Sequence, residues 1–229
     1  MSDSDPRAQR HGASTTTLPL MEVFEQAAPG RKGQILAAAL EVFSTRGYSA
    51  GSMREIAGRV GVTEPALYRH FPGKDAIFLA LIRVVGGRTR DEGCKLIAEL
   101  EPETLREQIV AAFADRRKAM RRYGPLLRTV VTTVPRNPQF LAEYRSAVIG
   151  PLHSQLTAKA IELDAAFGLP DGDATRDSRV RALLALLVGY LFSSFIIGDE
   201  VDEGIADAAL SVMGWRQFVP NARTSTRRD

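Results

Sequence analysis

The apolar residues of this chain recur at the spacing of an α-helix, and this periodicity constrains the fold more than any other feature. Ile35, Ala38, Ala39, Val42 and Phe43 fall three and four residues apart, as neighbours on one helix face do. Stretches with the same period continue into the C-terminal region, whereas no alternating apolar and polar run of useful length is present. The sequence therefore predicts an all-α fold.

Two short helices separated by a three-residue break are predicted near the N-terminus. Ser52, followed by Glu55 three residues later, has the arrangement of a capping box and starts a helix over residues 53–60. Thr63 caps a second short helix over residues 64–70. Such a pair is the helix-turn-helix arrangement, whose second helix can enter the major groove of DNA.

The rest of the chain predicts further helices. They span residues 31–47, 74–84, 102–123, 139–167, 179–197 and 202–218, with a shorter helix that begins at residue 124. The helix over 139–167 is expected to bend at Gly150–Pro151. The helix over 179–197 is apolar on more than one face and needs cover on more than one side. We expect a disordered arm (1–30), a helix-turn-helix DNA-binding domain (31–76), a helical ligand-binding and dimerisation domain (77–219) and a flexible tail (220–229).

Charge and composition limit the classes of function. Between Arg31 and Arg90, ten Lys and Arg stand against four Asp and Glu, although the whole chain carries a net charge of only +3. A basic segment of this kind fits contact with a polyanion and equally fits a solvated basic surface. Cys94 is the only cysteine, and the three histidines lie far apart, so no disulfide, metal site or cofactor is expected.

No apolar run reaches the length of a membrane span, and the N-terminal residues lack the apolar core of a signal peptide. A cytoplasmic protein without membrane contact is therefore expected. His153 stands beside Ser154 and near Asp164, but adjacent residues without an oxyanion site do not make a catalytic triad. The sequence predicts a protein that is not an enzyme.

The residues at 52–57, 60–63, 67–71 and 74–75 resemble the DNA-binding segment of the tetracycline-repressor (TetR) family. The combination that carries the likeness is Ala57, Gly61, Leu67, Tyr68, Phe71 and Lys74. Residues 35–48 resemble the first helix of that family. The resemblance implies a homodimeric transcriptional repressor that binds palindromic double-stranded operator DNA and is released by a small hydrophobic or amphipathic effector. A helical small-molecule-binding protein without DNA function is the alternative.

The resemblance also implies roles for single residues. Arg54 and Pro65 match positions that often touch bases, and phosphate contacts are implied for Ser52, Tyr68, His70 and Lys74. Glu64 either accepts from a cytosine amino group or stabilises its own helix terminus. The predicted DNA-contacting residues are Ser52, Arg54, Thr63, Glu64, Pro65, Tyr68, Arg69, His70 and Lys74. The competing interpretations are a solvated charge for Arg69, a core aromatic for Tyr68, and plain packing or capping for His70.

The C-terminal part predicts an effector pocket and a dimer interface. The pocket residues are Phe113, Arg116, Met120, Tyr123, Leu126, Val130, Tyr144 and Phe192, although aromatics at helical spacing also fit plain core. The interface residues are Leu152, Leu156, Leu163, Leu183, Leu187 and Gly189. Gly86–Gly87 lies in the fourth helix and is expected to soften the connection between the two parts.

Overall fold

The structure is a computed structural model, and it describes residues 20–170, 174–197 and 204–219. All regular elements within these ranges are helical, which confirms the all-α class. The α-helices are α1 Leu20–Ala27, α2 Arg31–Ala50, α3 Met53–Val60, α4 Glu64–Tyr68, α5 Lys74–Leu81, α6 Gly87–Ala98, α7 Leu105–Thr133, α8 Pro138–Tyr144, α9 Gly150–Ala166, α10 Arg176–Ile197 and α11 Gly204–Met213. Two π-helical turns, η1 Ile82–Gly86 and η4 Arg145–Ile149, and two 3₁₀ turns, η2 Pro102–Thr104 and η3 Val134–Arg136, complete the set.

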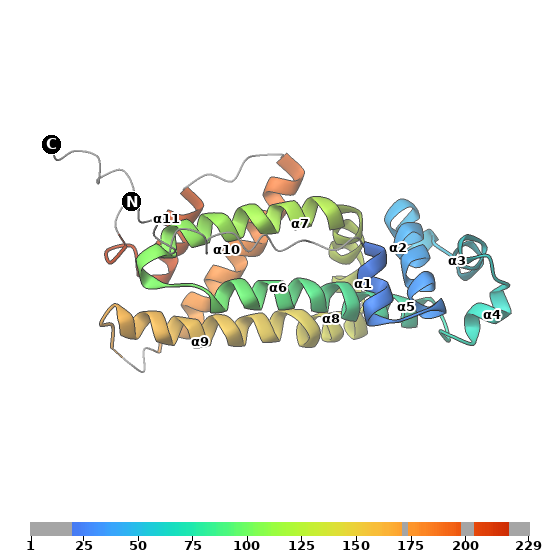
Figure 1. The fold of residues 1–229 in the computed structure, drawn as a ribbon, viewed down its shortest axis with the longest axis horizontal. Coiled ribbons are helices and arrows are strands. Elements are labelled where there is room, and N and C mark those ends of the chain that lie inside the picture. Colours follow the sequence, from blue (N-terminus) through green and yellow to red (C-terminus); the bar gives the residue numbers. More distant parts are fainter. Residues whose placement is uncertain (1–19, 171–173, 198–203, 220–229) are drawn as a thin grey trace, which may run out of the picture.

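The molecule is elongated, with α3 and α4 at one end, while α6, α7 and α9 run along its length (Figure 1). We call residues 31–81 (α2 to α5) the head and residues 87–213 (α6 to α11) the body. Buried apolar residues form two clusters, one centred on the head and one between α7, α9, α10 and α11. The fold therefore has two hydrophobic cores, and the head and the body are joined by the helical path from α5 through η1 to α6 and by packing of α2 on α7.

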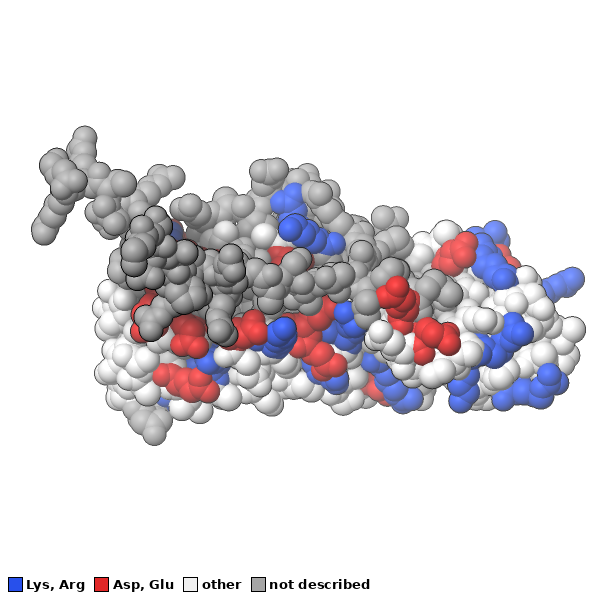
Figure 2. Space-filling model, in the orientation of Figure 1, with Lys and Arg blue, Asp and Glu red and all other residues white. Residues whose placement is uncertain are grey.

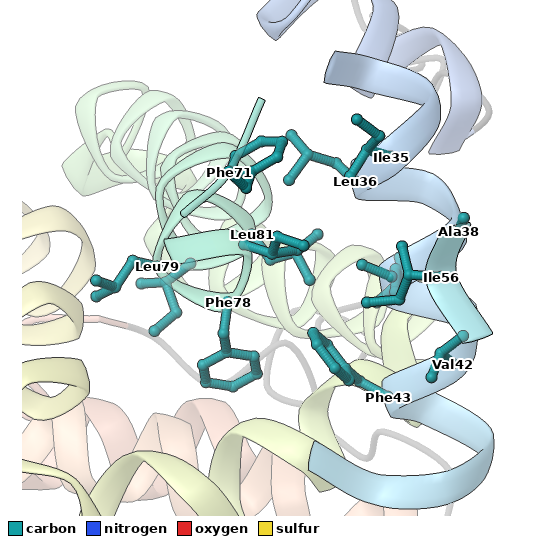
Figure 3. Packing of buried hydrophobic residues seen from close by; sticks show 14 of the residues in the cluster. Ile35, Leu36, Ala38, Val42, Phe43, Ile56, Phe71, Phe78, Leu79 and Leu81 are labelled. Atoms are coloured by element: carbon teal, nitrogen blue, oxygen red, sulfur yellow. The ribbon is translucent and has the colours of Figure 1, made fainter. Parts of the chain in front are cut away.

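The core of the head is built from side chains that converge from α2, α3 and α5 (Figure 3). Ile35, Phe43 and Ile56 are fully buried. Phe78 of α5 lies 4.8 Å, centroid to centroid, from Phe140 of α8 and so joins the head to the body. The cluster thus continues past residue 76, where the sequence places the domain boundary, and the division of the chain at that residue stays a prediction.

Helix α1 corrects the expectation of a disordered arm over residues 1–30. Val23 and Phe24 are 4% and 1% exposed, because α1 packs across the start of α2. Gly33 permits this crossing, since a Cβ there would lie 2.5 Å from the carbonyl oxygen of Ala28. The polar composition of the arm concealed this short apolar face. Residues 1–19 of the expected arm and the expected tail at 220–229 lie outside the described residues.

The two π-helical turns contact each other where the head meets the body. Arg83 of η1 donates two hydrogen bonds of 2.8 Å to Glu143 of α8, and this contact lowers the pKa of Glu143. A Cβ on Gly86 would lie 2.7 Å from Cγ2 of Val148. Gly86 therefore allows close packing against Val148, and the expectation that the Gly86–Gly87 pair softens the connector stays a prediction.

A π-helical turn, η4, stands immediately before Gly150–Pro151, where the sequence predicts a bend, and the bend itself stays a prediction. Pro151 has no N–H to donate to the carbonyl four residues earlier, that of Ala147. Nη1 of Arg90 donates to this carbonyl oxygen at 3.1 Å. The α6 helix thus supplies the hydrogen bond that the proline removes.

Other helix boundaries also differ from the prediction, among them those of α7, α10 and α11. Helix α7 continues through Gly124–Pro125 to Thr133, since a proline inside a helix can bend it without ending it. Helix α10 begins at residue 176 instead of 179. Helix α11 ends at Met213, because Gly214 takes a left-handed φ of 75° and the Trp215 N–H then bonds the Leu210 carbonyl at 2.8 Å.

The end of the body farthest from the head is held by a buried carboxylate, Asp164 of α9, whose side chain is 1% exposed. Its Oδ2 accepts from Nε of Arg176 at 2.8 Å and from Nη2 of Arg179 at 3.1 Å. Its Oδ1 accepts from Nε1 of Trp215 at 2.7 Å. One side chain therefore ties α9 to α10 and to the segment after α11.

Candidate nucleic-acid interface

Helix α3 begins at a complete capping box, as predicted. Oγ of Ser52 accepts from the Glu55 N–H at 3.2 Å, and Oε2 of Glu55 accepts from the Ser52 N–H at 3.3 Å. Ile56 and Ala57 on the opposite side of α3 are buried against the head core. These contacts fix the orientation of α3, and they leave the side chain of Arg54 exposed.

Helix α4 follows a turn in which Gly61 has a φ of 74°. Oγ1 of Thr63 accepts from the Ala66 N–H at 3.4 Å, which confirms Thr63 as the N-cap. Leu67 is fully buried, whereas Tyr68 is 47% exposed. A five-residue helix, α4, is thus anchored by Leu67 and by the buried Phe71 that follows it, and it presents its outer side to solvent at the end of the molecule (Figure 1).

The predicted DNA-contacting residues gather on this end. Exposed side chains are Ser52, Arg54, Thr63, Pro65, Tyr68 and Arg69, and half-buried ones are Glu64, His70 and Lys74. The core interpretation of Tyr68 is wrong, because Leu67 and Phe71 take the inward positions. For Glu64, Arg69 and His70, both the DNA contact and the competing interpretation stay predictions.

Positive charge is concentrated at the same end. Figure 2 shows Lys and Arg side chains over the end of the head that carries α3 and α4. Arg46 pairs with Glu55 at 3.6 Å and Arg59 pairs with Glu41 at 3.3 Å. Arg54 has no ion-pair partner among the described residues, and the same holds for Arg69. These two cations keep their full hydrogen-bonding capacity for an external anion or base edge.

Lys74 is placed differently from the expectation of a phosphate contact. Its Nζ donates to the carbonyl oxygens of Tyr48, Ser49 and Gly51 at 2.9, 3.1 and 3.1 Å. It also lies 4.6 Å from the centroid of the Tyr48 ring. An ammonium group has three N–H donors, and all three are used inside the head. Lys74 therefore joins the start of α5 to the end of α2, and this geometry corrects its predicted role.

The Tyr48 side chain belongs to the same junction. Its hydroxyl donates to a carboxylate oxygen of Asp75, and its ring lies 4.9 Å from that of Phe78. Burial of the phenol, reinforced by the contact with Asp75, raises the pKa of Tyr48. The hydroxyl therefore stays protonated and keeps donating at physiological pH.

Comparison with known proteins assigns this head. The family model described as bacterial regulatory proteins, tetR family, matches residues 35–81, which run from α2 to the end of α5. The head therefore matches the DNA-binding domain of the TetR family. Over 53 residues it is 53% identical to the HTH-type transcriptional activator FasR of Mycolicibacterium smegmatis, a match that covers 23% of this chain and 24% of FasR. The likeness to this curated regulator is thus confined to the head, which has the helix-turn-helix arrangement of TetR-family DNA-binding domains.

Solved structures extend the likeness to the body at the level of the fold. The TetR-family regulator PfmR of Thermus thermophilus has a TM-score of 0.57 and 21% identity, covering 78% of this chain and 96% of PfmR. The SmeT–triclosan complex has a TM-score of 0.60 and 20% identity, covering 79% of this chain and 90% of SmeT. The body of this chain therefore shares its fold with these two proteins.

The predicted effector pocket is only partly assembled. Phe113 lines an apolar cavity in the body, and Arg116 follows one helical turn later. Val130 and Tyr144 instead pack against the head cluster, so they do not share a cavity with Phe113. The side chains of Met120, Tyr123, Leu126 and Phe192 lie outside the described residues. Arg88 and Glu92, which lie beside Arg116, were missed, although their spacing of four residues indicates one helix face.

Three of the six predicted dimer-interface residues are buried within one subunit, which corrects the prediction for those three, while the other three stay predictions. Leu156, Leu163 and Leu183 are buried in the body cluster, Leu187 lines the cavity, and Leu152 contacts α6 opposite Gly93. Gly189 is exposed. The apolar residues that remain open on α9 and α10 include Ile161, 45% exposed, and Val188, 56% exposed. Sequence periodicity identified apolar helices but not which face each helix turns inward.

The described residues contain neither a candidate membrane span nor a candidate metal site. None of the helices within the described ranges is long and apolar enough to cross a bilayer. No group of three or more His, Cys, Asp and Glu side chains in the same ranges could hold a metal ion.

Proposed function

We propose that the protein is a transcriptional repressor that binds a palindromic operator as a homodimer and leaves it when a small apolar effector binds. The observation that carries this proposal is the exposed outer side of α4, which protrudes at the end of the head beside the unpaired guanidinium of Arg54. A B-DNA major groove is about 12 Å wide and admits such a helix. Two heads must reach successive grooves, about 34–36 Å apart.

Repression is proposed because a dimer seated on an operator blocks access to the same DNA. The SmeT–triclosan complex supports small-molecule binding in a protein of this fold. The apolar cavity of the body supports an effector of low polarity here. Selection of bound sequences from a random duplex pool tests the proposal: recovery of a palindrome supports it, and binding that is independent of both sequence and salt contradicts it.

Dimerisation is proposed to use the open apolar face of α9 and α10, centred on Ile161 and Val188. We expect Val188→Glu to shift the protein toward monomers, because a charge in a symmetric interface meets its own copy. Sedimentation velocity measures the shift. Val131→Glu is the matched control, since Val131 is 46% exposed but lies on α7. Equal sedimentation of the Val188→Glu variant and the control would contradict the assigned face.

Base recognition is proposed for Arg54. We expect Arg54→Ala to weaken operator binding by about 1–3 kcal/mol and to relax the preference at one base position, because Arg reads a guanine edge with two donors. Tyr68→Phe is the comparison variant, since loss of a phosphate contact weakens all sequences alike. Affinities measured on a set of single-base operator variants distinguish the two. A uniform loss in Arg54→Ala would refute the base-reading role.

A further inference from the structure

The body contains an apolar cavity of about 80 Å³. Its wall comes from α6, α7, α9, α10 and α11 and includes Trp215, the only tryptophan of the chain. Lys159 is the only charged residue of the lining, and its Nζ lies 2.6 Å from Glu162. Ligand pockets usually measure about 300–1,000 Å³, so a ligand that enters here must enlarge the cavity.

A cluster of charged side chains lies one helical turn beyond this cavity. Glu92 is one turn before Leu96, which lines the cavity from α6, and Arg116 is one turn after Ala112, which lines it from α7. Nη2 of Arg116 lies 3.0 Å from Oε2 of Glu92, and Nε of Arg88 lies 3.0 Å from Oε1 of the same carboxylate. The cluster therefore bridges α6 and α7, whereas α6 packs mainly on α9.

Arg116 in this cluster has unused hydrogen-bonding capacity. Its side chain is 15% exposed and that of Glu92 is 10% exposed. Nε and Nη1 of Arg116 are buried and have no hydrogen-bond partner among the described residues. Buried donors without an acceptor are unfavourable, so both positions favour an incoming acceptor atom.

The charge of the cluster restricts the chemistry of that acceptor. Arg116 also lies 2.7 Å from Asp115, so the positive charges of Arg88 and Arg116 are balanced by the negative charges of Glu92 and Asp115. A carboxylate ligand would add a net negative charge to a largely buried site, which is unfavourable. A carbonyl oxygen accepts the free N–H groups without adding charge.

We infer that Arg116 is the polar end of the effector site and that the ligand is an uncharged apolar molecule with a carbonyl oxygen. The apolar part occupies the enlarged cavity toward Trp215, and the oxygen accepts from Nε or Nη1 of Arg116. This inference rests on the proposed function only in calling the ligand an effector. Binding itself is measurable on the free protein, without DNA.

Fluorescence of Trp215 provides the experiment, because this residue lines the cavity. The full chain is titrated with octane, 2-octanone and octanoate. We expect saturable binding of 2-octanone about tenfold or more tighter than that of octane, since a hydrogen bond to a charged donor contributes at least that much. We expect octanoate to bind more weakly than 2-octanone. Absence of saturable binding, or tightest binding by octanoate, overturns the inference.

Two variants locate the polar end. In Arg116→Met, we expect octane to bind as in the original chain and 2-octanone to lose its advantage. Lys159→Met is the matched control, because Lys159 is the other cation at the cavity, and it should keep the preference for the ketone. Loss of the preference in Lys159→Met alone would place the oxygen at the opposite end and refute the assignment. If Arg116→Met binds neither ligand, a second variant, Arg116→Gln, which retains a donor, must restore the ketone preference.

These titrations separate the inference from the proposed function. Binding with the expected preference but without any change in DNA affinity would retain the ligand site and reject the effector role. If a ligand releases the Arg116→Met variant from DNA as readily as it releases the original chain, the effector role is retained and this site is rejected.

Discussion

Replacement of Asp164 by Ala is expected to lower the free energy of unfolding by about 3–5 kcal/mol, because it removes the shared acceptor of a buried network. Arg176 and Arg179 would lose an anion at 2.8 and 3.1 Å, and the Trp215 indole would lose its acceptor at 2.7 Å. Loss of a buried counter-charge from two largely desolvated cations is costly, and the substitution also leaves a small void. Urea denaturation followed by circular dichroism, at one fixed protein concentration, measures the loss.

Asp177→Ala is the matched control for this prediction. Asp177 also forms an ion pair, with Arg181 at 2.7 Å, and it lies 3.1 Å from Nε2 of His153, but its side chain is 50% exposed. Exposed pairs contribute about 0–1 kcal/mol, so this variant should unfold almost like the original chain. Equal losses in the two variants would show that burial of the Asp164 network adds nothing to stability.

The head could be predicted from sequence because its signals are local. The capping box of Ser52 and Glu55, the cap at Thr63 and the turn glycine at residue 61 each act over a few residues. The buried positions of α2 follow directly from their period. The inward direction of Leu67 and the exposure of Tyr68 then follow from the same pattern.

The body resisted prediction because its specificity comes from contacts between distant segments. Asp164 meets Trp215 across 51 residues, and Arg83 meets Glu143 across 60. No local pattern reveals such pairs. Helix α10 is apolar around most of its surface, so period alone cannot separate Leu183, which is buried within the subunit, from Val188, which is open.

Lys74 shows the same limit inside the head. The resemblance to the family implies a phosphate contact for Lys74, and the fold does place it in the head, at the start of α5. The carbonyls that it binds belong to residues 23 to 26 positions earlier in the chain. The sequence alone does not distinguish a lysine that contacts phosphate from a lysine that caps a helix end, because the positions of the acceptor atoms depend on the folded structure.

Replacement of Lys74 by Met is therefore expected to lower the free energy of unfolding by roughly 3–4 kcal/mol, because three charge-assisted hydrogen bonds disappear and three carbonyls lose their donor. The salt dependence of operator binding should stay unchanged, since Lys74 neutralises no phosphate. Thermal unfolding measures the first effect, and affinity titrations at several salt concentrations measure the second.

Arg69→Ala gives the opposite signature if Arg69 contacts phosphate. Its side chain is exposed and has no ion-pair partner among the described residues, so stability should change little. The slope of log affinity against log salt should then decrease by about 0.9, the value for one lost phosphate contact. If Lys74→Met instead reduced this slope and left the unfolding temperature unchanged, its Nζ would bind DNA, and the three carbonyls would have to find other donors in the complex.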